Sequence, residues 1–228
     1  MPKGSSIVHT ITSPVIEPFL SLNPSWARKK AAEEKMTLPG GLKFFIFPLM
    51  LIILLDVVLP IFTALTSAEE TPLSNTIARS GESAYISLVL PVTLNLLVFE
   101  VIKFVAYIVL FGIANLAAFM ILKAGGKGKF GSQFYQTSRV AAIFAIIFVV
   151  SLQFVSISLP AVLAIFLIGL LLAVYCTYII LVILAELYSI EKSGVVLPSL
   201  FFLVQFLISL YPLVLMVIIL LTPCVGRC

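Results

Sequence analysis

Asp56 is the side chain of this sequence that is best placed to do chemistry. It lies in the middle of the apolar run 42–66, four residues before Pro60. A carboxylate at that depth of a bilayer costs about 2.5–3.5 kcal/mol on insertion scales, so it should face other helices or water. There it would bind a cation, carry protons, or accept hydrogen bonds from polar residues such as Asn95, Asn115, Gln153 or Gln205. Because we expect no second acidic residue at mid-depth, we interpret Asp56 as structural and keep transport as the alternative.

A basic, glycine-rich segment at 123–139, KAGGKGKFGSQFYQTSR, is the second candidate. Residues 126–131 match GxGxxG, but in a nucleotide-binding fold that pattern follows a strand, whereas here it follows an apolar helix. No serine or threonine follows a Gly-Lys pair, as a phosphate-binding loop requires. We therefore predict a flexible loop whose Lys127, Lys129 and Arg139 contact anionic headgroups or a cytosolic partner.

Other kinds of chemistry lack the residues they need. The single histidine, His9, lies in a polar tail, so this chain cannot assemble a histidine metal site or a Ser-His-Asp triad. Cys176, Cys224 and Cys228 lack the CxxC spacing of zinc and redox sites. We expect no catalytic, cofactor-binding or metal-binding residues, and hence not an enzyme. The net charge of +4 marks the cytoplasmic side of a membrane protein better than a nucleic-acid partner.

The composition shows which elements must position these residues. The chain has 228 residues, of which 61% are hydrophobic and 11% charged, with a mean hydropathy of +1.22. Soluble domains have about 45–50% apolar and about 25% charged residues. A chain this apolar is suited to a lipid bilayer. Each membrane span needs about 20 apolar residues. We predict an all-α, polytopic membrane protein: a five-helix transmembrane bundle with a short interfacial N-terminal helix.

The apolar runs predict a transmembrane region at 42–222. The reach 84–122 is too long for one crossing, because its 39 residues would extend for about 58 Å against about 30 Å of hydrocarbon. We interpret 84–99 as an interfacial or re-entrant lead-in, with one long tilted helix as the alternative. Glu100 and Lys103, three residues apart, should pair. Pro48, Pro60, Pro198 and Pro212 should bend their helices. The predicted spans are 42–66, 101–122, 140–158, 161–185 and 195–222.

Residues 1–41 are predicted to form a cytoplasmic tail that contains the interfacial helix. Asn23 and Pro24 are a typical helix start, so we expect a helix from Pro24 to about Met36. Its aromatic and apolar residues should lie at headgroup level, and its basic residues should contact lipid or a partner. The first group is Phe19, Leu20 and Trp26, and the second is Arg28, Lys29 and Lys30.

The charges predict how the chain is oriented. Five spans put the termini on opposite sides, and with the N-terminus in the cytoplasm the cytoplasmic segments hold eleven basic residues. The outer segments hold two, Arg79 and Arg227, and Lys103 is not counted because it lies close to a span. The positive-inside rule favours this orientation, with residues 223–228 as an external tail. The eleven are Lys3, Arg28, Lys29, Lys30, Lys35, Lys43, Lys123, Lys127, Lys129, Arg139 and Lys192.

Three motifs resemble those of the Yip family, the Ypt/Rab-interacting membrane proteins and their prokaryotic relatives. They are LNP at 22–24, GGKGKF at 125–130 and ELYSIEKSG at 186–194, and the resemblance covers about 15–215 with the five-span layout. The DLYGP-like and GY-then-Pro segments of eukaryotic members are absent, which favours a prokaryotic-type member. The resemblance implies a scaffold, organising or trafficking factor that binds a partner through cytoplasmic loops.

We therefore expect a non-catalytic, multi-pass protein of a prokaryotic cell membrane. Its expected partners are the lipid bilayer, anionic headgroups, and a protein on the cytoplasmic side or within the membrane. Two alternatives stay open: an accessory subunit of a larger membrane complex, and a small transporter or channel that uses Asp56.

Overall fold

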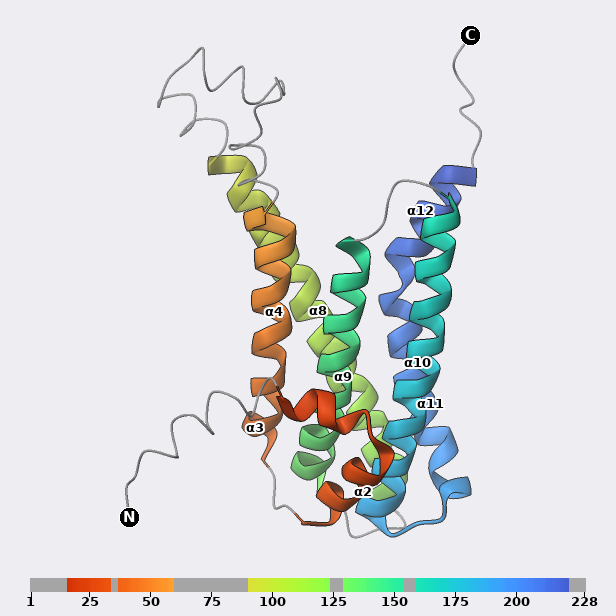
Figure 1. Ribbon diagram of the computed structural model, residues 1–228. Helices are drawn as coiled ribbons and strands as arrows, with labels where there is room; N and C mark the ends of the chain where they lie inside the picture. The colour runs from red at the N-terminus through yellow and green to blue at the C-terminus, as the bar shows by residue number, and fades with distance from the viewer. Residues whose placement is uncertain (1–15, 34–36, 60–89, 124–128, 154–158, 222–228) are drawn as a thin grey trace, which may run out of the picture. The chain divides into compact units, whose positions relative to one another are not determined.

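The computed structural model describes residues 16–33, 37–59, 90–123, 129–153 and 159–221 (Figure 1). Within these ranges all regular structure is helical, and five helices are long and apolar enough to cross a membrane. These findings confirm the all-α fold class and the multi-pass architecture. The chain divides into two units, one made of Met1–Pro48 with Val109–Cys228 and the other of Leu49–Ile108. The candidate spans are Leu38–Val58, Leu97–Lys123, Phe130–Ser151, Pro160–Tyr188 and Lys192–Ser209.

The N-terminal part contains the predicted helix, α2, which spans Pro24–Glu33. Asn23 caps it, since its Oδ1 accepts hydrogen bonds from the backbone N–H of Ser25 at 3.0 Å and from the Ser25 hydroxyl at 2.7 Å. Pro24 occupies the first turn, where the missing N–H costs nothing. Residues 16–21 form a further helical turn before it. We call residues 16–33 the N-terminal strap; the predicted extension to Met36 lies outside the described residues.

The first span changes its helical type along its length. It consists of α3 (Leu38–Leu42), a 3₁₀ turn (Lys43–Phe45), α4 (Ile46–Ile52) and a π-helical segment (Ile53–Val58). Pro48 has no N–H to donate to the carbonyl of Phe44, which lies in the 3₁₀ turn. The helix thus begins four residues before the predicted position 42, and the predicted residues 60–66 lie outside the described ranges.

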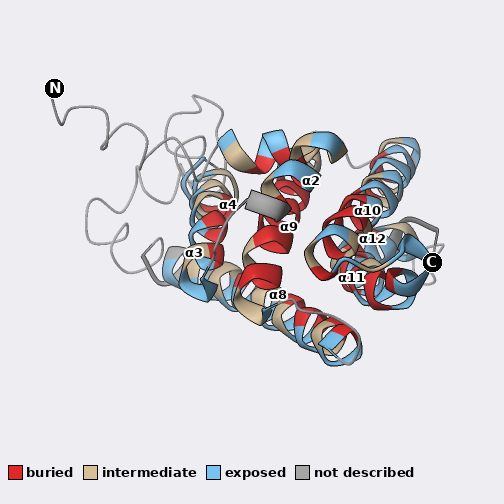
Figure 2. Cartoon of the chain, turned by 90° about the horizontal axis from the view of Figure 1, so that it is seen from below, coloured by how far each residue is buried: buried red, intermediate tan, exposed pale blue. Residues whose placement is uncertain are grey.

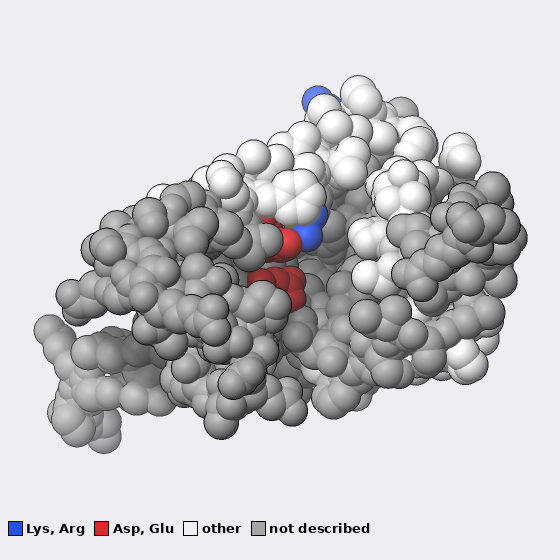
Figure 3. All heavy atoms as spheres, turned by 90° about the horizontal axis from the view of Figure 1, so that it is seen from above, with Lys and Arg blue, Asp and Glu red and all other residues white. Residues whose placement is uncertain are grey.

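The second span differs from our preferred interpretation. Helix α8 runs without a break over Leu90–Lys123, about 51 Å at 1.5 Å per residue. The lead-in predicted for 84–99 is therefore wrong over 90–99, where the long-helix alternative holds. Pro91 lies in the first turn, where no N–H is needed. Lys103 Nζ lies 2.5 Å from Glu100 Oε1, so the predicted pair neutralises both charges within the helix. Figure 3 shows acidic and basic atoms side by side on an otherwise largely neutral described surface.

The third span begins ten residues earlier than predicted. Helix α9 spans Phe130–Gln153, so residues 130–139, predicted as a loop, are helical. Six of these ten residues have polar side chains that are buried. Residues 124–128 and 154–158 lie outside the described ranges.

Helix α10 spans Leu159–Tyr188 and ends in a Schellman motif within the predicted hinge. Ser189 adopts a left-handed conformation with φ 54°. The N–H of Ile190 donates to the carbonyl of Ala185 at 3.1 Å, and the N–H of Ser189 donates to that of Glu186 at 3.2 Å. These bonds satisfy the last carbonyl groups of the helix and turn the chain toward the fifth span.

The fifth span is interrupted near one of its two prolines. It consists of a 3₁₀ turn (Lys192–Val195), α11 (Val196–Ser209) and α12 (Tyr211–Leu221). The helix is interrupted at Leu210, two residues before Pro212, where the sequence predicted a bend. Pro198 lies in the first turn of α11 and begins the helix instead of bending it.

The burial pattern is that of a protein surrounded by lipid. Large apolar side chains are exposed along the outer sides of the helices, among them Leu171, which is 71% exposed, and Met120, at 63%. Asn115, Gln133 and Arg139 are instead buried. Figure 2 shows buried residues where α9, α10 and α11 face one another and exposed residues on the outer sides. This arrangement supports the membrane-spanning architecture, since a soluble protein would hide its apolar side chains.

Candidate functional site

The first ten residues of α9 hold the main concentration of buried polar side chains in the described chain. They pack against α3 and α10, and two groups of contacts satisfy them. One group joins transmembrane helices to one another, and the other joins α9 to the N-terminal strap. The buried polar residues of this stretch are Ser132, Gln133, Gln136, Thr137, Ser138 and Arg139.

The first group, which we call the Gln133 network, comprises Asn115, Gln133, Thr137 and Tyr188. Gln133 Nε2 donates to the backbone carbonyl of Asn115 at 2.8 Å, and the Tyr188 hydroxyl donates to Gln133 Oε1 at 2.7 Å. The Thr137 hydroxyl donates to Asn115 Oδ1 at 2.8 Å. The network therefore ties α8, α9 and α10 together. Because these side chains are buried, each missing hydrogen bond would leave a costly unsatisfied group.

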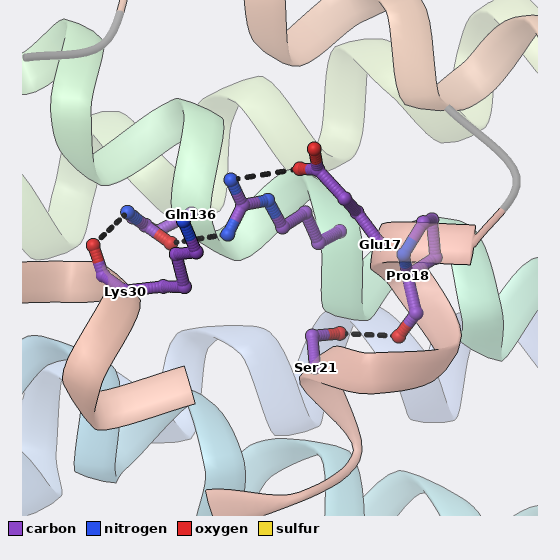
Figure 4. A network of polar contacts seen from close by, with 6 residues as sticks. Glu17, Pro18, Ser21, Lys30 and Gln136 are labelled. Atoms are coloured by element: carbon purple, nitrogen blue, oxygen red, sulfur yellow. Dashed lines mark hydrogen bonds and ion pairs between the residues drawn. The ribbon is translucent and has the colours of Figure 1, made fainter. Parts of the chain in front are cut away.

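The second group, the Arg139 clamp, comprises Glu17, Gln136, Arg139 and the backbone of Lys30 (Figure 4). Arg139 Nη2 lies 2.9 Å from Glu17 Oε2, and Nη1 donates to Gln136 Oε1 at 3.1 Å. Gln136 Nε2 in turn donates to the carbonyl of Lys30 at 3.2 Å. Since Glu17 and Lys30 lie near the two ends of the strap, the clamp fixes the strap at both ends.

Aromatic rings surround the guanidinium of Arg139. Its Cζ lies 4.7 Å from the ring centroid of Tyr135, 5.3 Å from that of Trp26 and 5.6 Å from that of Phe44. Each is within range of a cation–π interaction. The Arg139 side chain is 1% exposed and that of Glu17 is 26% exposed. The carboxylate and the rings together stabilise a charge that would otherwise be expensive to bury.

A close approach of backbones brings Phe44 to this position. Gly40 and Gly41 of α3 lie against α9, and a Cβ atom on Gly41 would lie 2.8 Å from Phe134 Cδ1 and 3.0 Å from the Cα of Tyr135. The rings of Phe44 and Tyr135 then meet edge to face, with centroids 5.1 Å apart. The two glycines thus allow the first span to lie close to the clamp.

The structure changes the roles predicted for the basic residues. Arg139 is buried in the clamp, so its prediction as a lipid or partner contact is wrong. The reason is that 130–139 forms a helix that the strap covers. Trp26 is half-buried over Arg139, and Lys30 is half-buried with its carbonyl bound by Gln136. Lys29 and Lys129 are exposed as predicted. Lys127 lies outside the described residues.

Arg28 is exposed as well and makes a weak link to α10. Its Nε lies 3.8 Å from Glu186 Oε2, and the two side chains are 54% and 39% exposed. Earlier in α10, the Tyr175 hydroxyl donates to the backbone carbonyl of Leu22 at 2.7 Å. The strap thus contacts α10 as well as α9.

Asp56 lies in the other unit, in the π-helical segment Ile53–Val58, and is partly buried. π-helical turns inside α-helices often occur at functional sites. In the parts of the chain that the structure describes, no three His, Cys, Asp or Glu side chains gather in a group that could hold a metal ion.

Glu17, Gln133, Gln136 and Tyr188 were not predicted as site residues. A signal was present, because polar residues recur three and four positions apart from Gln133 to Arg139, which is a helical spacing. In comparisons with known proteins, no family model, no curated protein and no solved structure matches this chain.

Proposed function

We propose that this chain is a non-catalytic, multi-pass membrane protein that acts as a scaffold, organising or trafficking factor, as its resemblance to the Yip family implies. The observation that supports this function is the Arg139 clamp. Its buried ion pair holds the N-terminal strap against α9, while Arg28 and Lys29 of the strap are exposed. Because the clamp fixes the strap, the exposed residues of the strap keep a defined arrangement, which a binding surface requires.

The proposed binding surface is a set of exposed basic residues, which we call the cytoplasmic face. Figure 1 shows α2, the start of α9, the end of α10 and the start of α11 at the same end of the molecule. We propose that this end lies in the cytoplasm of a prokaryotic cell, with the C-terminus outside, because the basic residues concentrate there. The face consists of Arg28, Lys29, Lys43, Lys123, Lys129 and Lys192.

The proposed partners are anionic lipid headgroups and a protein that carries acidic groups. Lysine and arginine side chains at the ends of spans attract both partners through their positive charge. Neither partner requires a preformed pocket. Lys127, two residues before Lys129 in the sequence, belongs to the same proposed surface.

Purification in mild detergent, followed by mass spectrometry of proteins that co-elute in stoichiometric amount, tests this function. We expect a partner whose recovery falls several-fold in Lys127→Gln/Lys129→Gln, without loss of membrane insertion. Lys103→Gln, which removes a positive charge outside this face, should leave recovery unchanged. Equal recovery from all three proteins would contradict the proposal. Co-elution of a defined set of membrane subunits, in amounts that do not depend on these lysines, would indicate that this chain is an accessory subunit instead.

One observation favours transport as a second candidate function. Asp56, a carboxylate within a predicted span, lies in a π-helical segment. In proteoliposomes this function predicts a cation- or proton-dependent flux that Asp56→Asn abolishes and that Lys103→Gln preserves. Wild-type protein without any such flux would rule it out.

A further inference from the structure

The outer side of the N-terminal strap exposes an apolar patch. Ile16, Phe19 and Leu20 are 51%, 47% and 44% exposed. They are spaced three and four residues apart, so they share one side of the helical turn at 16–21. The opposite side is occupied, since Glu17 binds Arg139 and Ser21 is buried. This turn is therefore amphipathic, with its apolar side turned away from the protein.

The strap lies where the exposed apolar surface of α10 ends. That surface includes Leu171 and continues to Tyr175 and Tyr178, which are 42% and 46% exposed. From Ile179 to Tyr188 the only exposed residue is Glu186. Tyrosines are typical of the boundary between hydrocarbon and headgroups. Because the Tyr175 hydroxyl binds the carbonyl of Leu22, the strap meets α10 at this boundary.

The second half of the strap exposes positive charge farther along α10, beyond this boundary, because its Arg28 lies by Glu186 and not by Tyr175. Ala27 and Ala31 are buried, and Arg28 and Lys29 between them are exposed. Glu186 lies near Arg28, but the 3.8 Å separation and the exposure of both side chains make this pair weak. Arg28 thus remains available to a stronger anion. An apolar patch followed by exposed cations is the pattern of a segment that lies in a membrane surface.

We propose that the N-terminal strap docks on anionic lipid, with Ile16, Phe19 and Leu20 at the acyl boundary and with Arg28 and Lys29 on the phosphate groups. The Arg139 clamp holds the strap in this orientation from the protein side. The strap then binds anionic lipids in preference to neutral ones. Because the strap is fixed to α9, the binding of these lipids is coupled to that helix. This deepens the lipid-binding part of the proposed function and needs no protein partner.

Tryptophan fluorescence tests the docking, because Trp26 is the single tryptophan of the chain. In a Trp26→Phe background, Phe19→Trp puts the reporter on the apolar patch and Ser25→Trp puts it on an exposed position of α2. The proteins are reconstituted into vesicles of phosphatidylcholine that contain an equal fraction of either brominated phosphatidylglycerol or brominated phosphatidylcholine. Bromine quenches tryptophan only on contact with the acyl chain, whereas iodide quenches it from water.

We expect Phe19→Trp to be quenched by brominated lipid and Ser25→Trp by iodide. Brominated phosphatidylglycerol should quench Phe19→Trp about twofold more than brominated phosphatidylcholine, and Arg28→Gln/Lys29→Gln should remove that difference. Iodide quenching of both reporters, without quenching by lipid, would overturn the docking. Equal quenching by the two brominated lipids would overturn the selection of anionic lipid.

The wild-type protein provides a second measurement that needs no substitution. Its Trp26 is half-buried and lies against Arg139, so brominated lipid should quench it less than it quenches Phe19→Trp. Quenching of Trp26 as strong as that of Phe19→Trp would count against the proposed orientation of the strap. Since these samples contain no other protein, their outcome is independent of whether a partner is captured in the purification experiment.

Discussion

Arg139 Nη2 lies 2.9 Å from Glu17 Oε2, and through this ion pair the tenth residue of α9 holds the N-terminal strap. The guanidinium is enclosed by protein on all sides, with the rings of Trp26, Phe44 and Tyr135 around it. A residue that the charge pattern assigns to a loop thus determines where the strap lies.

Removing the carboxylate of this pair should destabilise the protein. Glu17→Gln leaves the Arg139 charge buried without its anion, and we expect a loss of about 3 kcal/mol in the free energy of unfolding. Arg28→Gln is the matched control, because it removes an exposed pair worth about 0–1 kcal/mol. Unfolding in mixed detergent micelles measures both. Equal losses would mean that the buried pair does not hold the strap.

Gly41 should not tolerate a side chain. The Cβ of Gly41→Ala would meet Phe134 and the backbone of Tyr135 at 2.8–3.0 Å. Because a backbone cannot move aside like a side chain, we expect a loss of about 1–3 kcal/mol, measured as a lower thermal unfolding midpoint. Gly112→Ala is the control, since nothing lies within 4 Å of its Cβ position. Its stability should stay the same or rise, and a loss as large as that of Gly41→Ala would contradict this packing.

The Gln133 network should depend on Tyr188. Tyr188→Phe removes the donor to Gln133 Oε1 and leaves a buried acceptor unsatisfied, at a cost of about 1–3 kcal/mol. Tyr178→Phe removes an exposed hydroxyl and should change stability by less. Thermal unfolding of the two variants side by side provides the comparison. If Tyr178→Phe lowered the unfolding midpoint more than Tyr188→Phe, the Gln133 network would not stabilise the packing of α8, α9 and α10.

Replacing Ser189 by glycine should stabilise the protein. Its φ of 54° costs about 1–2 kcal/mol for a residue with a Cβ atom, and glycine avoids that cost. We expect Ser189→Gly to raise the stability by about 1 kcal/mol, whereas Ser189→Ala should bring no gain. A lower unfolding midpoint for the glycine variant would show that the Ser189 side chain has another role.

The span pattern was predictable from the sequence because hydrophobic length alone determines it. The five candidate spans, the cap at Asn23 and the break near Pro212 follow from apolar runs and from the chemistry of asparagine and proline. The break assigned to the long helix α8 rested on length, because the run 84–122 is longer than the hydrocarbon is thick. Glu100 and Lys103 neutralise each other on one side of this helix, and the helix continues past them.

The candidate site was not predictable in the same way. Residues 130–139 have the composition of a loop, and they form a helix because Asn115, Tyr188 and the strap satisfy their polar side chains. Those partners lie far away in the sequence, so local composition contains no sign of them. Glu17 likewise has no neighbour in the sequence that marks it as the anion of a buried arginine.

Site-specific photo-crosslinking tests the proposed organising function most directly. A benzoylphenylalanine is placed in native membranes at Lys129 or at Lys192, both on the cytoplasmic face, or at Leu171 on the exposed apolar surface as a control. We predict one defined protein adduct from both face positions, weakened by Lys127→Gln or by Arg28→Gln/Lys29→Gln, and lipid adducts from position 171. If the face positions gave no protein adduct while position 171 gave one, the partner would bind within the membrane, and the claim of a cytoplasmic binding face would be wrong.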